Sequence, residues 1–207
     1  MLCAQWMFCL KVRSDPGWAK EAVANFDKVL ADHAHCEMKA ASNALSLAAR
    51  HPDDLALVRA LTDLAKEELE HFQQVLGFLE RRRIPLGPPE VDTYAADLRK
   101  AANERPSALA PLVDRLLVGA LIEARSCERF KLLLGEIEAT EGREMFEFYS
   151  DLFAAEARHY RTFCDLAIAA AGGARDTVEA RLEALSILEG EIVSRLARNT
   201  FRGFIHG

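Results

Sequence analysis

Acidic and imidazole side chains interrupt the apolar faces of four long helical stretches in this sequence. In each stretch, apolar residues recur at intervals of three and four, as expected of a helix that buries one face. The interruptions are Glu37 in the first stretch, Glu68 and His71 in the second, Glu123 in the third, and Glu156 and His159 in the fourth. An isolated buried carboxylate costs several kcal/mol unless it is paired, protonated or bound to a metal ion. The sequence therefore favours a fold in which the four helices bring these six side chains to one site.

The spacing of the six residues favours a metal site. Glu68 and His71 form one Glu-x-x-His pair, Glu156 and His159 form another, and the chain has no third. Residues at i and i+3 project from neighbouring points on one helical face, so each pair can bind a single ion. A core-facing glutamate precedes each pair by a similar distance, from 37 to 68 and from 123 to 156. This order of ligands is typical of ferritin-like di-iron and di-manganese carboxylate bundles, where two divalent ions balance four glutamates.

Several neighbouring residues have more than one interpretation. One Glu-x-x-His pair alone is usually a solvated contact on a charged helix, and only the matched repeat favours a ligand set. His33 lies one turn before Glu37 and either hydrogen-bonds a ligand or is a capped or partly exposed histidine. Glu128 lies off the apolar stripe, and we expect it at the surface. Cys36 and Cys127 are expected to be small core residues.

The rest of the pattern predicts an all-α protein with a ferritin-like four-helix bundle and additional short helices. Strand signals are almost absent, and good helix formers dominate. Thr140 is expected to cap the fourth long helix, and Gly172-Gly173 to end it. The expected helices span about 18–50, 53–82, 92–103, 109–137, 140–171 and 175–198. The expected domain organisation is an irregular N-terminal extension over 1–17, one di-iron helical domain over 18–199 and a C-terminal tail over 200–207.

Composition restricts the class of protein further. The 207 residues carry a net charge of −6, which argues against a generic nucleic-acid coat but leaves room for a local basic patch. No apolar run approaches the roughly 20 residues of a membrane-spanning helix. The five cysteines are dispersed and form no CxxC pair, which favours a reducing compartment. We therefore expect a cytoplasmic protein without membrane contact.

The residues around the six candidate ligands narrow the prediction. They resemble the tRNA 2-methylthio-isopentenyl-adenosine hydroxylase family over the segments 32–41, 66–72, 117–130 and 155–160. The resemblance extends from about Trp18 to Arg198, and the stretch Glu123–Phe130, Glu-Ala-Arg-Ser-Cys-Glu-Arg-Phe, is its most specific part. The first fourteen residues look unlike the start of the family, and no inference rests on them.

The resemblance implies a non-haem di-iron monooxygenase that hydroxylates the isopentenyl side chain of a hypermodified adenosine next to the anticodon. The metal ligands that the resemblance implies are Glu37, Glu68, His71, Glu123, Glu156 and His159. Their chemistry agrees, because carboxylates with two imidazoles suit iron or manganese better than zinc or copper. No catalytic residue is expected beyond these ligands. The expected cofactors are two iron ions, with O2 as co-substrate and an external electron donor. The expected partners are the tRNA and an electron-donating reductase, and the protein should be a monomer or dimer.

The sequence offers several candidates for the substrate contacts and for the function. Arg81, Arg82 and Arg83 form the densest basic cluster, while Lys39, Arg125 and Arg129 lie near the ligands in sequence and could reach tRNA phosphates. Such arginines are more often solvated or paired with nearby glutamates. Apolar residues for a prenyl channel would be Phe72, Phe130 and Phe163, although core packing is the commoner role. The alternatives are iron storage, a manganese catalase-type oxidoreductase, and an interaction bundle without metal.

Overall fold

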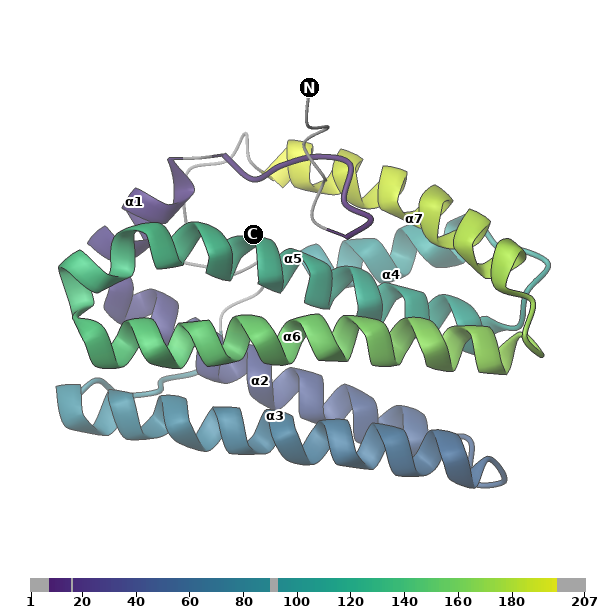
Figure 1. Cartoon of the computed structure of the whole chain (residues 1–207), viewed down its shortest axis with the longest axis horizontal. Coiled ribbons are helices and arrows are strands. Elements are labelled where there is room, and N and C mark those ends of the chain that lie inside the picture. Colours follow the sequence, from purple (N-terminus) through teal and green to yellow (C-terminus); the bar gives the residue numbers. More distant parts are fainter. Residues whose placement is uncertain (1–7, 16, 90–92, 197–207) are drawn as a thin grey trace. The chain divides into compact units, whose positions relative to one another are not determined.

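The computed structural model describes residues 8–15, 17–89 and 93–196. Within these residues every regular element is a helix and there is no strand, which confirms the all-α prediction (Figure 1). The seven helices are α1 Trp18–Ala24, α2 Phe26–Ala49, α3 Leu55–Arg82, α4 Tyr94–Glu104, α5 Pro111–Glu141, α6 Arg143–Ala170 and α7 Arg175–Leu196. None of these helices has the combined length and hydropathy that a membrane-spanning segment needs.

The chain divides into two compact units. Among the described residues, the two-helix unit comprises residues 24–89 and contains α2 and α3. The five-helix unit comprises residues 8–15, 17–23 and 93–196 and contains α1 and α4 to α7. The predicted C-terminal tail over 200–207 and the last residues of the predicted domain, 197–199, lie outside the described residues.

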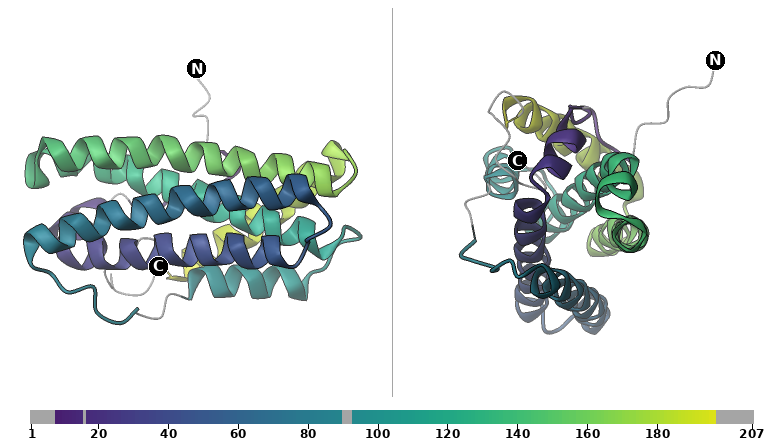
Figure 2. Two further views of the ribbon diagram at one scale, coloured as in Figure 1. Left: turned by 90° about the horizontal axis from the view of Figure 1, so that it is seen from below. Right: turned by 90° about the vertical axis from the view of Figure 1, so that its left-hand side faces the viewer.

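In the two-helix unit, α2 and α3 form an antiparallel hairpin and lie side by side along their length (Figures 1 and 2). Asp54 begins α3 as its N-cap, because its carboxylate Oδ1 accepts a hydrogen bond of 2.9 Å from the amide of Leu57. Arg83 ends α3 in the left-handed conformation, with φ of 58°. The apolar residues that recur at helical spacing form the buried faces, including Leu30 and Ala34 on α2 and Leu61 and Leu64 on α3.

In the five-helix unit, α5 and α6 form the second long antiparallel pair (Figure 1). Gly142, with φ of +89°, joins the two helices and stands at the N-cap of α6. The predicted cap, Thr140, is wrong, because α5 continues through it and its hydroxyl donates to the carbonyl of Glu136. The predicted end of α6 is confirmed, since Gly172 and Gly173 have φ of +66° and +86°.

One further difference from the predicted helices has a local cause. The helix expected over 18–50 is interrupted at Asn25, whose φ of −124° and ψ of 33° lie outside the helical region. Asparagine is a weak helix former because its side chain competes for backbone hydrogen bonds.

The N-terminal segment over 8–15 has no helix, as predicted, but it packs closely on the five-helix unit. Leu10 and Ser14 of this segment are both buried.

Candidate metal centre

The two-helix unit brings together Glu37 from α2 with Glu68 and His71 from α3. One ligand atom of each lies within 4.8 Å of the others, and we call this group the two-helix cluster. His71 Nδ1 lies 3.8 Å from Glu37 Oε2 and 3.7 Å from Glu68 Oε2. These separations are too long for hydrogen bonds. They suit atoms that face a common cation, since two donors that each bind at about 2.1 Å lie at most about 4.2 Å apart.

The five-helix unit repeats this arrangement with Glu123 from α5 and with Glu156 and His159 from α6. Their ligand atoms also lie within 4.8 Å of one another, and we call this group the five-helix cluster. His159 Nδ1 lies 3.8 Å from Glu156 Oε2, which matches the corresponding separation in the two-helix cluster. Each unit therefore contains two glutamates and one histidine, placed by the same Glu, Glu-x-x-His order in the sequence.

Burial makes these clusters suitable for metal binding. None of the six residues is more than 8% exposed. Among the described residues, Glu156 Oε2 is buried and accepts no hydrogen bond. Buried carboxylate oxygens are normally hydrogen-bonded, paired or bound to a cation. The donor set of each cluster, two carboxylates and one imidazole, fits iron or manganese.

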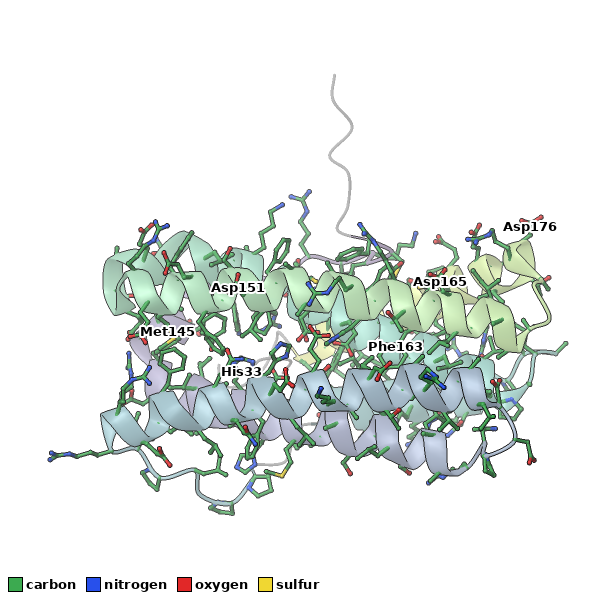
Figure 3. The ribbon with its side chains drawn as sticks, turned by 60° about the horizontal axis from the view of Figure 1, so that its bottom comes forward. His33, Met145, Asp151, Phe163, Asp165 and Asp176 are labelled. Atoms are coloured by element: carbon green, nitrogen blue, oxygen red, sulfur yellow. The ribbon has the colours of Figure 1, made fainter. Side chains whose placement is uncertain are left out.

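His33 adds a direct contact to the two-helix cluster. Its Nε2 lies 2.6 Å from Glu37 Oε1, and both side chains are buried. An ionised carboxylate can only accept a hydrogen bond, so His33 donates through Nε2–H. Of the two interpretations that the sequence left open, the structure selects a histidine that hydrogen-bonds a candidate ligand. His33 is labelled in Figure 3.

Cys127 lies close to the five-helix cluster but is not part of it. Its thiol donates to the carbonyl of Phe153 over 3.6 Å. Burial raises the pKa of the Cys127 thiol, and the neighbouring Glu156 carboxylate raises it further. A protonated thiol is neither a metal ligand nor a nucleophile. Cys127 is therefore a small core residue, as predicted.

Four of the six basic residues predicted to contact tRNA are exposed on the two-helix unit: Lys39, Arg81, Arg82 and Arg83. Arg81 stacks on the ring of Phe78 at 4.5 Å, and Arg82 donates to Asp27 over 3.2 Å. Their guanidinium groups sit at the C-terminal end of α3, in agreement with the favourable position of cations there.

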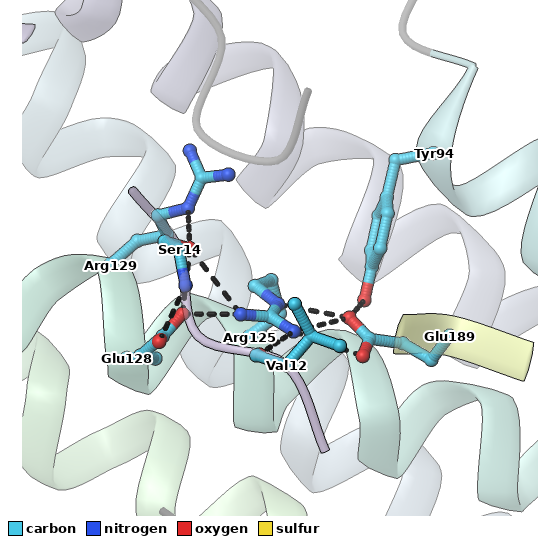
Figure 4. Close-up of polar contacts among 7 residues, drawn as sticks. All are labelled: Val12, Ser14, Tyr94, Arg125, Glu128, Arg129 and Glu189. Atoms are coloured by element: carbon cyan, nitrogen blue, oxygen red, sulfur yellow. Dashed lines mark hydrogen bonds and ion pairs between the residues drawn. The ribbon is translucent and has the colours of Figure 1, made fainter. Parts of the chain in front are cut away.

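The other two predicted contacts, Arg125 and Arg129, lie in the interior of the five-helix unit, 0% and 6% exposed (Figure 4). Arg125 forms a bidentate pair with Glu189 of α7, with both N···O distances 2.9 Å, and also pairs with Glu128. Arg129 Nε donates to Ser14 Oγ over 2.6 Å, and its guanidinium stacks on the Trp18 ring. These enclosed side chains are unavailable to a phosphate in solution, which corrects the prediction that they contact tRNA.

The N-terminal segment completes this polar network. Ser14 donates to the two carboxylate oxygens of Glu128, through its amide over 2.9 Å and its hydroxyl over 2.7 Å. Arg125 Nη2 donates to the carbonyl of Val12 over 2.9 Å (Figure 4). Glu128 is thus an interior partner of Arg125, and the expectation of a surface position was wrong. Tyr94 of α4 donates to Glu189 over 2.9 Å, so the network joins α4, α5, α7 and the N-terminal segment.

The network also explains how the charges tolerate burial. Burial, together with the nearby charge of Arg125, lowers the pKa of Arg129 to about 10. Burial raises the pKa of the Glu189 carboxyl, whereas the pair with Arg125 opposes this rise. Two arginines and two glutamates balance one another within the network, which is the condition under which buried charges are stable.

Three comparisons place the chain among known proteins. The family model described as tRNA-(MS[2]IO[6]A)-hydroxylase (MiaE) matches residues 2–204. The tRNA 2-(methylsulfanyl)-N(6)-isopentenyladenosine(37) hydroxylase of Pseudomonas putida is 45% identical over 72% of this chain and 70% of its own length. The enzyme of the same name from Salmonella typhimurium is 31% identical over 82% of this chain and 77% of its own length.

A solved structure agrees with the fold. It is a protein from Synechococcus described as having aldehyde deformylating oxygenase activity, with a TM-score of 0.83 and 36% identity over 98% of this chain and 96% of that one. This likeness confirms the predicted ferritin-like helical fold. Both relatives with curated names are hydroxylases of a modified adenosine in tRNA. The family match spans nearly the whole sequence, and the chain accordingly belongs to the tRNA-(MS[2]IO[6]A)-hydroxylase family of enzymes.

Proposed function

We propose that this protein hydroxylates the isopentenyl side chain of 2-methylthio-isopentenyl-adenosine in tRNA, next to the anticodon, in an O2-dependent reaction. Membership of a family of tRNA hydroxylases supports the reaction and the substrate. The observation that carries the proposal is the repeated cluster of two glutamates and one histidine, buried in each unit with its donor atoms within 4.8 Å of one another.

The cofactor in this proposal is a pair of iron ions. Three donors come from each unit: Glu37, Glu68 and His71 from one, and Glu123, Glu156 and His159 from the other. When bound, the irons supply the dioxygen chemistry that hydroxylation of an unactivated C–H bond requires. The four carboxylates act as ligands and balance the charge of two divalent ions, and none of them serves as a general acid. An external reductase supplies the electrons.

The protein contributes a site that excludes water. Phe163, one turn after His159 on α6, is labelled in Figure 3. It is buried and lies against Gly119 of α5. This contact places an apolar ring one turn from the candidate ligand His159, where this proposal requires the prenyl channel. Phe130 instead packs edge to face on Tyr149 with ring centroids 5.3 Å apart, which is core packing. A dry environment strengthens the interactions of the carboxylates with bound cations.

The tRNA contact in this proposal is the exposed basic group on the two-helix unit, Arg81 to Arg83 with Lys39. Phosphate contacts position a nucleic acid without reading its sequence, and an anticodon loop offers the splayed base that enzymes recognise. The tRNA substrate agrees with the expected cytoplasmic location, and we expect a monomer or dimer in solution.

The experiment that tests this function is mass spectrometry of tRNA nucleosides from cells with and without the gene. We expect the prenylated, methylthiolated adenosine to gain one oxygen atom only when the protein is present. A matched pair of variants on α3 separates the metal site from general folding: Glu68→Ala should abolish the oxidised nucleoside, and Glu70→Ala, at an exposed position, should retain it. An unchanged nucleoside profile in the absence of the protein would contradict the proposal.

A further inference from the structure

The two clusters share their ligand order but differ at one position. His33 stands four residues before Glu37, on the same face of α2. The corresponding position before Glu123 on α5 is Gly119, which has no side chain. A Cβ atom at Gly119 would lie 3.0 Å from the ring of Phe163, so this space is already filled by an apolar side chain. The two units therefore differ at this position. The two-helix unit has the hydrogen-bond donor His33, whereas in the five-helix unit the ring of Phe163 fills the space beside Gly119.

The two carboxylate oxygens of Glu37 make different contacts. Oε1 lies 2.6 Å from His33 Nε2, a short hydrogen bond to a carboxylate. Oε2 is the oxygen that faces His71, at 3.8 Å from Nδ1. The hydrogen bond favours one rotation of the carboxylate, in which Oε2 is turned toward His71 and the cluster. Partners of this kind orient metal ligands, and their loss commonly costs about 10- to 100-fold in metal affinity.

We propose that His33 is a positioning residue that orients the Glu37 carboxylate, so that Oε2 is the oxygen offered to iron at the two-helix cluster. This inference rests on the proposed function, because it assumes that the clusters hold iron. It requires only the hydrogen bond between His33 and Glu37.

The test is Mössbauer spectroscopy of the full-length protein, reconstituted anaerobically with ferrous iron, together with the affinity for each iron. In the wild type we expect ferrous signals that account for two bound irons. His33→Phe should weaken the binding of one iron by about 10- to 100-fold and change only its signal. His33→Gln should restore both properties, because its side-chain amide can donate to Oε1. Should His33→Phe fail to fold, His33→Ala is judged by the same criteria.

The matched control is His35→Phe. His35 is buried on the same helix, and among the described residues its Nε2 has no hydrogen-bond partner. This change should leave both iron signals unchanged. Two bound irons with unaltered signals in His33→Phe would overturn this inference alone. A wild-type protein that binds no iron would overturn the proposed function as well.

Discussion

Arg125 and Glu189 form a bidentate ion pair between α5 and α7, with Arg125 Nε and Nη2 each 2.9 Å from a carboxylate oxygen. Both side chains are completely buried. Arg125 lies within the sequence stretch that most specifically resembles the hydroxylase family, two residues after the candidate ligand Glu123. The pair gives this stretch a structural role, because it fixes α5 against α7 while Glu123 on the same helix belongs to the five-helix cluster.

Removal of Glu189 should destabilise the protein strongly. Glu189→Ala leaves the Arg125 guanidinium buried with less compensation, and breaking such a pair costs about 3–5 kcal/mol. The free energy of unfolding in urea measures this loss. Glu183→Gln is the control on the same helix, since Glu183 pairs with Lys11 at the surface, where 57% of the glutamate side chain is exposed. We expect less than about 1 kcal/mol for the control. Equal effects of the two changes would contradict the structural role of the pair.

The N-terminal segment should contribute to stability through Ser14. Ser14→Ala removes the hydroxyl that accepts from Arg129 and donates to Glu128. The buried donors and acceptors that remain should cost about 1–3 kcal/mol. Lys11→Ala, in the same segment, removes only a surface ion pair and should cost under about 1 kcal/mol. A Ser14→Ala protein as stable as the wild type would show that the segment is not an integral part of the fold.

Two glycines on α5 should respond in opposite directions to the same substitution. Gly119→Ala places a Cβ atom 3.0 Å from the Phe163 ring, and overpacking of this kind costs about 1–3 kcal/mol. Gly135→Ala meets no atom within 4 Å and should stabilise the helix by about 0.5–1 kcal/mol. Thermal unfolding of the two variants measures the difference. Stabilisation by both substitutions would refute the close contact between Gly119 and Phe163.

Neutralising the basic group at the end of α3 should weaken tRNA binding. We expect Arg81→Gln, Arg82→Gln and Arg83→Gln together to reduce the slope of log affinity against log salt by about 2 to 3. The double variant Arg59→Gln and Lys66→Gln, on exposed positions of the same helix, is the control and should change the slope little. If low-salt affinity for tRNA is the same in the triple variant and the wild type, the basic group is not part of the interface.

The helices could be predicted from the sequence because their apolar periodicity is regular and their ends carry strong signals. Gly172-Gly173 marked the end of α6 correctly, since only glycine readily adopts positive φ. Thr140 misled the prediction because threonine can cap a helix or bond back to its preceding turn, and periodicity does not distinguish the two. The interruption at Asn25 was missed for a similar reason: one weak helix former within a long amphipathic pattern is an ambiguous signal.

The candidate ligands could be found because a carboxylate on an apolar face needs a physical explanation. Glu189 carried the same signal and was missed. It lies between Leu185 and Ile192 on the buried face of α7, but its partner Arg125 is 64 residues away in the sequence. Sequence spacing identifies partners one turn apart and gives no information on partners from distant helices. For the same reason, the burial of Arg125 and Arg129 could not be predicted, and they were considered as tRNA contacts.

The most direct test of the account is the iron content of the anaerobically reconstituted protein and of its α3 variants. We predict two irons per chain in the wild type, as in other ferritin-like carboxylate proteins. Glu68→Ala should lose iron while retaining its helical content, and Glu70→Ala should bind iron as the wild type does. A Glu68→Ala protein that retained the full iron content, or a wild type that bound none, would contradict the assignment of the six side chains as iron ligands.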